Sequence, residues 1–174
     1  TVDLSGKKAD GSRGTVEIVN GTITGNRNDT SGYGGGGVCA DSGDLTIDHC
    51  RITDNTAANG SGGGVSMGSK HGGTVENASL TIKDSVISGN TSTAQGGGVH
   101  LTGNGSRFVM KGGTIAGNNA NCGGGIYSEN YEGISILGGA IQGNRAAKHG
   151  GGIYIRNSMP NRTIAGSVTN TVEQ

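Results

Sequence analysis

The sequence predicts an all-β solenoid, a single-stranded parallel β-helix in which each coil contacts only the coils before and after it. Three observations predict it. A Gly-Gly-Gly-aliphatic segment recurs at intervals of 27, 34, 27 and 27 residues, and a strict aliphatic–Ile–Asn spacing recurs within each interval. The composition also suits a core only one side chain deep, because 38 of the 174 residues are Gly and only 30% are apolar.

The glycine runs set the length of the repeat. Each run ends in Val or Ile, and the runs begin at Gly35, Gly62, Gly96, Gly123 and Gly150. Periods of this size are typical of solenoids. Glycine-rich polar chains are often disordered, but a disordered segment has no reason to keep Val, Ile and Leu in constant register. Glycine pairs between the apolar segments suit corners that need positive φ.

A second pattern divides each repeat into strands. An aliphatic residue or Met is followed five residues later by Ile and three residues after that by Asn, and another apolar residue stands two positions before the first member. This alternation is typical of a short strand with one face inward. In the third repeat the first strand carries Leu80 and Ile82, the second carries Ile87, and the Gly-Gly-Gly-Val segment forms the third. We therefore expect three short strands per coil.

The same spacing places five asparagines at one corner of successive coils. They are Asn26, Asn55, Asn90, Asn118 and Asn144. Stacked Asn side chains can hydrogen-bond along a solenoid axis, and Asn tolerates the left-handed conformation that sharp corners require. We interpret these residues as a structural ladder rather than as ligands or catalysts.

The repeats define the domain organisation. Five full coils span residues 16–155, and residues 1–15 and 156–174 are expected to form partial coils or caps. Residues 1–174 then form a single domain, and we expect it to be a fragment of a longer chain because solenoid ends need caps.

The paired motifs resemble those of a known group of surface proteins. Gly-Gly-Gly-[Val/Ile] and Ile-x-x-Asn look like the Gly-Gly-Ala-Ile and Phe-x-x-Asn repeats of chlamydial polymorphic outer-membrane proteins. They are also similar to adhesin-like right-handed β-helix proteins of gut bacteria and methanogens. The likeness covers residues 16–155 and implies a right-handed coil on a cell surface, acting as an adhesin or as the passenger of a secretion system. Two departures are Gly in place of Ala and Ile in place of Phe.

Composition limits the choice of partners. The 13 basic and 13 acidic residues balance, so no nucleic-acid partner is indicated. No apolar run of 18 residues exists, so this segment is not expected to insert into a membrane. His49, His71, His100 and His149 share no metal-ligand spacing, and Cys39, Cys50 and Cys122 include no C-x2-C pair. We expect no metal and no cofactor; the cysteines are interpreted as small side chains outside any disulfide, with a Cys39–Cys50 disulfide as the alternative.

One polar cluster offers weak catalytic candidates. Polysaccharide lyases with this fold gather acids for Ca²⁺ beside a Lys or Arg base. Here Asp48, His49, Lys83 and Asp84 fall on adjacent coils just beyond the first strand, with Asp48, Lys83 and Asp84 as the candidates. Solvated strand ends explain the same residues, so the chain is interpreted as leaning towards a non-enzymatic role.

A column of rings on the third strand is the candidate ligand-binding surface. If Val99, Ile126 and Ile153 point inward, His100, Tyr127 and Tyr154 point outward on three successive coils, where glycines would leave the rings on an open face. Rings about 4.8 Å apart could stack on sugar faces or contact a protein. The alternative is that aromatic residues simply favour exposed strand positions. Ice binding is a further possibility, because regular Thr rows on a flat β-solenoid face can order water. In this sequence the Thr rows end after two or three coils, which argues against it.

These observations predict a non-enzymatic cell-surface or secreted protein that serves in adhesion or as a rigid scaffold or spacer. Its partner would be a glycan or protein on a host or cell surface. The alternative is a carbohydrate-binding module, or a polysaccharide lyase or glycoside hydrolase, built on the same scaffold.

Overall fold

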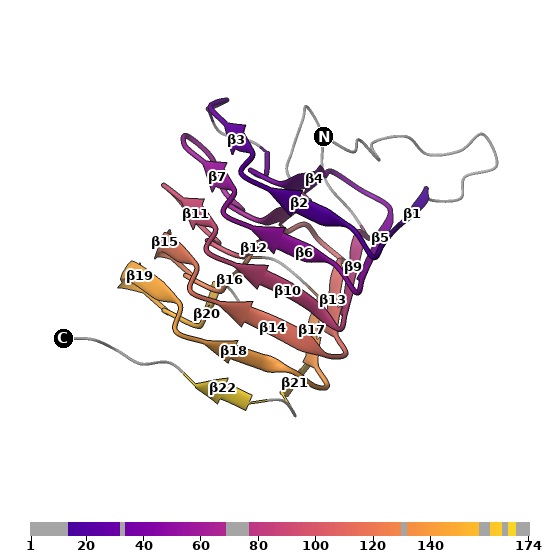
Figure 1. Ribbon diagram of the computed structural model, residues 1–174. Coiled ribbons are helices and arrows are strands. Elements are labelled where there is room, and N and C mark those ends of the chain that lie inside the picture. The colour runs from indigo at the N-terminus through magenta and orange to yellow at the C-terminus, as the bar shows by residue number, and fades with distance from the viewer. Residues whose placement is uncertain are drawn as a thin grey trace.

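The chain winds into a parallel β-solenoid of about five coils (Figure 1). The computed structural model describes residues 14–31, 34–68, 77–129, 132–156, 161–164 and 167–169. Within these ranges there is no helix, and every strand pairing is parallel. Each strand pairs with its equivalents in the adjacent coils, so the strands form sheets that run along the solenoid axis.

Four sheets make up the walls. The first contains β1 (Thr15–Val19), β5 (Asp44–Asp48), β9 (Ser79–Lys83), β13 (Arg107–Met110), β17 (Gly133–Ile136) and β21 (Asn161–Ile164). The second contains β2 (Thr22–Thr24), β6 (Arg51–Thr53), β10 (Ser85–Ser88), β14 (Gly113–Ala116), β18 (Ala140–Gln142) and β22 (Ser167–Thr169). These two sheets have six strands each.

The other two sheets have five strands each. The third contains β3 (Arg27–Asn28), β7 (Thr56–Ala57), β11 (Thr91–Ser92), β15 (Asn119–Cys122) and β19 (Arg145–His149). The fourth contains β4 (Val38–Ala40), β8 (Val65–Met67), β12 (Val99–Thr102), β16 (Ile126–Glu129) and β20 (Ile153–Arg156).

The number of strands per coil corrects the sequence-based prediction, which had three. The additional strand is the third-sheet strand, which begins directly after the ladder asparagine, for example β7 after Asn55 and β11 after Asn90. It is only two residues long in the first three coils. A strand of two residues carries no alternation of apolar and polar positions, so the pattern could not reveal it.

The core is a set of stacked aliphatic columns. Ile52, Ile87, Ile115 and Ile141 pair in register along the second sheet, and each is 0% exposed. Leu80, Phe108 and their neighbours do the same along the first sheet. At about 1.5–3 kcal/mol for each buried aliphatic side chain, these columns supply the main stabilisation. The N-terminal coil is less covered, because Val16, Ile18 and Ile23 are only partly buried.

At the glycine runs the backbone passes close to the backbone of neighbouring segments. A Cβ atom added at Gly97 would collide with Gly124 O of the next coil and would lie 2.6 Å from Asn119 O. Gly63 and Gly124 meet backbone atoms in the same way. The second glycine of the run is therefore required by close backbone approach. The first, such as Gly96 with φ of 64°, combines a positive φ with a close approach to Val99 O.

The predicted ends fall partly outside the described residues. The expected N-terminal partial coil or cap lies almost wholly there, since the description begins at Gly14. At the other end, β21 and β22 pair with β17 and β18 and start a further coil.

Candidate functional site

The five ladder asparagines hydrogen-bond from coil to coil. The Asn118 amide Nδ2 donates to Asn144 Oδ1 and to Ile87 O, both at 2.9 Å. Its Oδ1 accepts from the backbone N and from Nδ2 of Asn90, also at 2.9 Å. Asn55, Asn90, Asn118 and Asn144 are buried, and Asn26 at the start of the ladder is exposed. Both the donor and the acceptor of the Asn118 amide are thus satisfied within the corner, as expected for a structural residue.

A second polar row, which sequence reasoning missed, lies at the corner between the first and second sheets. Gly21 N donates to Cys50 Sγ at 3.4 Å, and Cys50 N donates to Ser85 Oγ at 3.0 Å. The Cys50 thiol in turn donates to Ile18 O at 3.2 Å. Because Cys50 is a free thiol, the alternative of a Cys39–Cys50 disulfide is wrong. Cys50 acts as a hydrogen-bonding corner residue. Cys50 and Ser85 each stand two residues before the second-strand Ile, and this equivalent position could have predicted the polar row.

The predicted column of rings exists, but it is not the open surface expected. His100 pairs in register with Tyr127, and Tyr127 with Tyr154. The His100 and Tyr127 ring centroids are 5.5 Å apart and stacked, and those of Tyr127 and Tyr154 are 5.6 Å apart. His100 is 8% exposed and Tyr127 only 1%. The expectation failed because alternation shows which side of a strand a residue faces and not what covers that side.

Polar contacts hold the rings in place. Ser66 Oγ lies 3.3 Å from His100 Nδ1, and the Tyr127 hydroxyl donates to Glu129 Oε2 at 2.8 Å. Arg156 Nη1 lies 3.5 Å from Glu129 Oε1. Burial lowers the pKa of His100 to about 4, and burial together with the Glu129 hydrogen bond raises the pKa of Tyr127 to about 12. Both rings are therefore neutral at ordinary pH.

The accessible end of this column lies at the last coil. Tyr154 is half-buried and His149 is exposed, and their ring centroids are 5.4 Å apart in a stacked arrangement. His149 was not included in the predicted ring column, because it stands on β19 rather than on β20. Only the folded coil brings it beside Tyr154.

The polar cluster forms around Asp48. His49 Nδ1 lies 2.5 Å from Asp48 Oδ1, and Lys83 Nζ lies 3.3 Å from Asp48 Oδ2 and 3.7 Å from Glu17 Oε1. The hydrogen bond from His49, followed by that from Lys83, lowers the pKa of Asp48 below its usual value against an opposing effect of burial. Asp48 therefore stays a carboxylate, which suits electrostatic stabilisation and not proton donation.

Asp84, the third predicted member, is placed differently. It is exposed, adopts a φ of 40°, and its carboxylate lies where a side chain on Gly112 of the next coil would be. Within the described ranges, no group of three or more His, Cys, Asp or Glu side chains is arranged to hold a metal ion. Glu17, which sequence reasoning did not select, takes the place beside Lys83.

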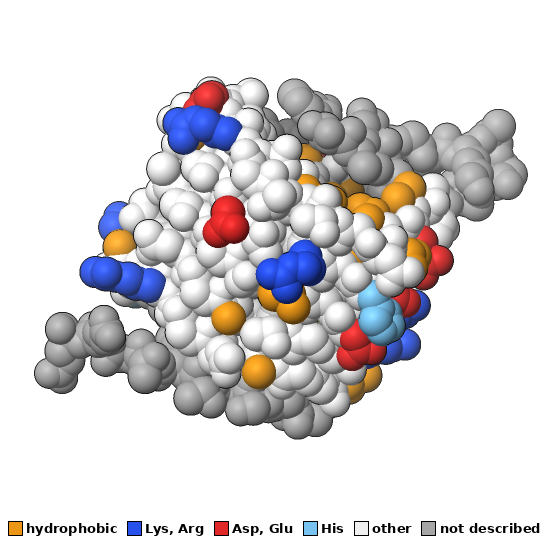
Figure 2. Space-filling model, viewed as in Figure 1, with side chains coloured by type: hydrophobic (Ala, Val, Ile, Leu, Met, Phe, Trp, Pro, Cys, Tyr) orange, Lys and Arg blue, Asp and Glu red, His pale blue; other side chains and the backbone are white. Residues whose placement is uncertain are grey.

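The outer face of the second sheet is flat and carries few charges. Figure 2 shows this face with uncharged polar side chains and backbone over most of its area and isolated charged groups. Its two outward rows begin with Thr22 and Thr24, and Thr53 Oγ1 donates to Thr24 Oγ1 at 3.1 Å. Further along, the rows change to Val86, Ala116 and Gln142.

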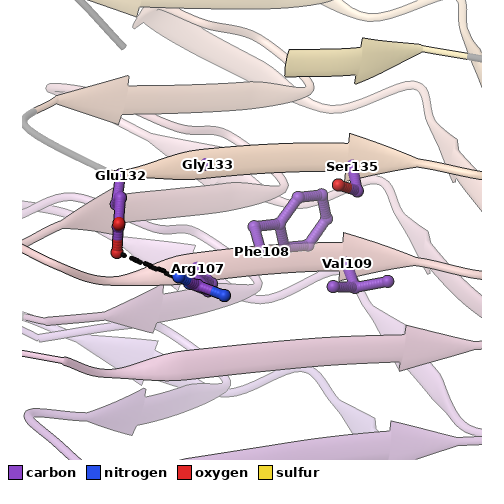
Figure 3. A pocket seen from close by; sticks show the side chains of 6 residues that line it. All are labelled: Arg107, Phe108, Val109, Glu132, Gly133 and Ser135. Carbon is purple, nitrogen blue, oxygen red and sulfur yellow. Dashed lines mark hydrogen bonds and ion pairs between the residues drawn. The ribbon is translucent and has the colours of Figure 1, made fainter. Parts of the chain in front are cut away.

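A shallow groove of about 230 Å³ lies on the outer face of the first sheet, between β13 and β17 (Figure 3). Its lining consists of Arg107, Phe108, Val109, Glu132, Gly133 and Ser135. Arg107 and Glu132 form an ion pair at one end, with Arg107 Nε 3.4 Å from Glu132 Oε2. The groove exists because Gly133 and Ser135 are small where neighbouring strands carry larger side chains.

Comparison with protein-family models, with curated proteins and with solved structures gives no match. Among the described residues, no helix is long and apolar enough to cross a bilayer. Function is therefore inferred from the geometry of the fold and its surface.

Proposed function

We propose that this protein is a non-enzymatic β-helix of the cell surface or the extracellular space, which serves in adhesion or as a stiff spacer. The observation that carries the proposal is the continuity of the scaffold. Aliphatic columns, fully buried in the central coils, and a four-step asparagine hydrogen-bond ladder connect each coil to the next. Such a scaffold resists bending and presents the same outward rows at about 4.8 Å intervals.

The location and the right-handed sense of the coil are part of this proposal. Both come from the resemblance of the Gly-Gly-Gly-[Val/Ile] and Ile-x-x-Asn motifs to those of adhesin-like surface proteins. The partner would be a glycan or protein on a host or cell surface.

Tyr154 is the best candidate for contact with a glycan. Its ring is partly accessible and is stacked against exposed His149. The Arg156–Glu129 ion pair lies on the neighbouring strand positions and offers donors and acceptors for sugar hydroxyls. Aromatic rings flanked by polar groups suit the mixed apolar and polar faces of a sugar. His100 and Tyr127 would support this ring from below and would not touch the ligand.

Binding of the purified protein to a panel of surface glycans tests this assignment. Tyr154→Ala should weaken binding at least roughly tenfold, as loss of about 1.4 kcal/mol would, whereas Tyr154→Phe should retain most of it because the ring remains. Circular dichroism should show that both variants are folded. Binding that is unchanged by Tyr154→Ala would exclude this ring as the contact.

The Asp48 cluster favours a second candidate, a polysaccharide lyase or glycoside hydrolase. Asp48 forms an ion pair with Lys83, and its pKa is lowered by hydrogen bonds from His49 and Lys83. The cluster therefore holds a carboxylate beside a cation. If the chain were such an enzyme, polysaccharide turnover would be abolished by Asp48→Asn or Lys83→Ala. Turnover of this kind would overturn the non-enzymatic proposal, and turnover that both variants retain would exclude this cluster as its source.

A further inference from the structure

The outer face of the first sheet carries three rows of side chains with an unusual order. The rows are Thr15, Asp44, Ser79, Arg107, Gly133; then Glu17, Thr46, Thr81, Val109, Ser135; then Val19, Asp48, Lys83, Lys111, Leu137. The acids stand on β1 and β5, whereas Arg107 and Lys111 stand on β13 and directly after it. β9 lies midway between β5 and β13 in the sheet.

We propose that this face is a self-complementary interface through which two copies of the chain form a two-fold symmetric dimer. The symmetry axis would run along β9. Such an axis keeps the direction of the strands and reverses the order of the coils, so that β5 faces β13 and β1 faces β17 of the second copy. A two-fold interface uses the same patch on both chains, and each contact between different residues occurs twice.

The third row shows the complementarity most clearly. Reversing the coil order puts Asp48 opposite Lys111 of the second copy and Lys111 opposite its Asp48. The same operation brings Val19 against Leu137. These two are the exposed large hydrophobic residues of the described chain, at 49% and 52% exposure. Lys83 would meet its own copy at the axis, and its ion pairs with Asp48 and Glu17 reduce that repulsion.

The other two rows agree with this arrangement. In the first row Arg107 falls opposite Asp44 of the second copy. In the second row Thr81 meets itself, and Val109 meets Thr46. Glu17, which is exposed, falls opposite Ser135, at the edge of the groove between β13 and β17 (Figure 3).

The size of the face limits the affinity. Five strands about 4.8 Å apart and about 16 Å long give roughly 400 Å² per copy. A stable interface buries about 800 Å² on each partner. We therefore expect a weak dimer that forms at high protein concentration and low salt, because screening of exposed charges increases with ionic strength.

Sedimentation equilibrium on the full chain, at protein concentrations up to about 1 mM and at about 50 and 500 mM NaCl, tests the proposal. The expected result is a monomer–dimer equilibrium that weakens with salt. Lys111→Glu creates two facing acid pairs and should raise the dissociation constant roughly tenfold or more. Arg51→Glu makes the same charge change on the second sheet and should leave it unchanged.

Mixing two variants gives the sharper test. Lys111→Glu alone places a glutamate against Asp48 of the second copy, and Asp48→Lys alone places a lysine against Lys111, so each variant should remain monomeric. In a one-to-one mixture both contacts become opposite in charge, and a heterodimer should form. The proposal is overturned if the unaltered chain stays monomeric at low salt, if Arg51→Glu and Lys111→Glu act equally, or if the mixture does not associate.

Discussion

At the scale of single residues, the asparagine at the corner of each coil links neighbouring coils through its side chain. Its amide supplies a donor and an acceptor at once, so one residue type can accept from the coil before it and donate to the coil after it. Asn118 does both and also donates to a backbone carbonyl. The repeat of Asn in the sequence therefore follows from satisfaction of buried polar groups.

Asn118→Ala should lower the free energy of unfolding by about 3–4 kcal/mol, because four hydrogen bonds worth about 1 kcal/mol each are lost inside the coil. Urea denaturation followed by circular dichroism measures this change. Asn26→Ala is the matched control at the exposed start of the ladder, where we expect a loss of about 1 kcal/mol or less. Equal losses at the two positions would contradict the ladder as a source of stability.

His100 gives the molecule a predictable acid sensitivity. Its pKa is lowered from 6.5 to about 4 by burial. The unfolded chain therefore binds a proton between these pH values that the folded chain does not. The contribution of neutral, buried His100 to the free energy of unfolding is therefore fully present above about pH 6.5. The free energy of unfolding falls by roughly 2–3 kcal/mol as the pH drops towards 4.

Unfolding free energies measured between pH 4 and 7 test this expectation. His100→Gln should flatten the pH dependence in this window, whereas His149→Gln, on an exposed ring, should not. Asp48, whose pKa is lowered below 3.8, contributes in the same direction only at still lower pH. A steep loss of stability near pH 5 that survives His100→Gln would show that another group is responsible.

At the scale of elements, the glycine run and the short third-sheet strand depend on each other. The incoming Gly-Gly-Gly segment passes so close to the third-sheet strand that a Cβ atom on its middle glycine would meet backbone atoms. The middle glycine packs against the first residue of this strand, for example Gly63 against Thr91 and Gly97 against Asn119, directly after the ladder asparagine. The glycines are thus required by packing as well as by conformation.

Gly97→Ala should destabilise the protein by more than about 3 kcal/mol or prevent folding, because neither Gly124 O nor Asn119 O can move without breaking a ladder of hydrogen bonds. Gly117→Ala is the control. Gly117 has a φ of 61° but open space around it, so it should cost about 1 kcal/mol for backbone strain alone. Thermal melts of the two variants separate these effects, and a mild Gly97→Ala would contradict the close approach.

At the scale of the whole molecule, stability is a sum of contacts between neighbouring coils. The central coils contact neighbours on both sides, and their core residues are completely buried. The first coil lacks a neighbour among the described residues, and its aliphatic residues are partly exposed. Local opening should therefore be more frequent in this coil than in the central coils.

Hydrogen exchange measures this gradient directly. Amide protons of β9, β10, β13 and β14 should exchange most slowly, and those of β1 and β2 at least roughly tenfold faster, because each coil interface adds to the cost of opening. The first and second sheets make this comparison between strands of similar length. Uniform protection along the axis would show that the solenoid opens only as a single cooperative unit.

The sequence by itself determined the parallel solenoid and the positions of the core and ladder residues. Each of these follows from a periodic pattern, because stacking puts equivalent residues into equivalent environments, and equivalent environments select the same residue types. Ile87 and Asn90 could be placed inside from spacing alone. The two-residue strands are too short to show any such pattern and were missed.

Only the tertiary structure decided what covers each face and which coils bring charges together. His100 and Tyr127 were correctly placed in one column but were expected to be open, and burial depends on segments distant in sequence. The pairing of Lys83 with Glu17 and the contact between His149 and Tyr154 likewise join different strands. A pattern along the chain specifies the side of a strand, whereas exposure and partnership depend on the path of the rest of the chain.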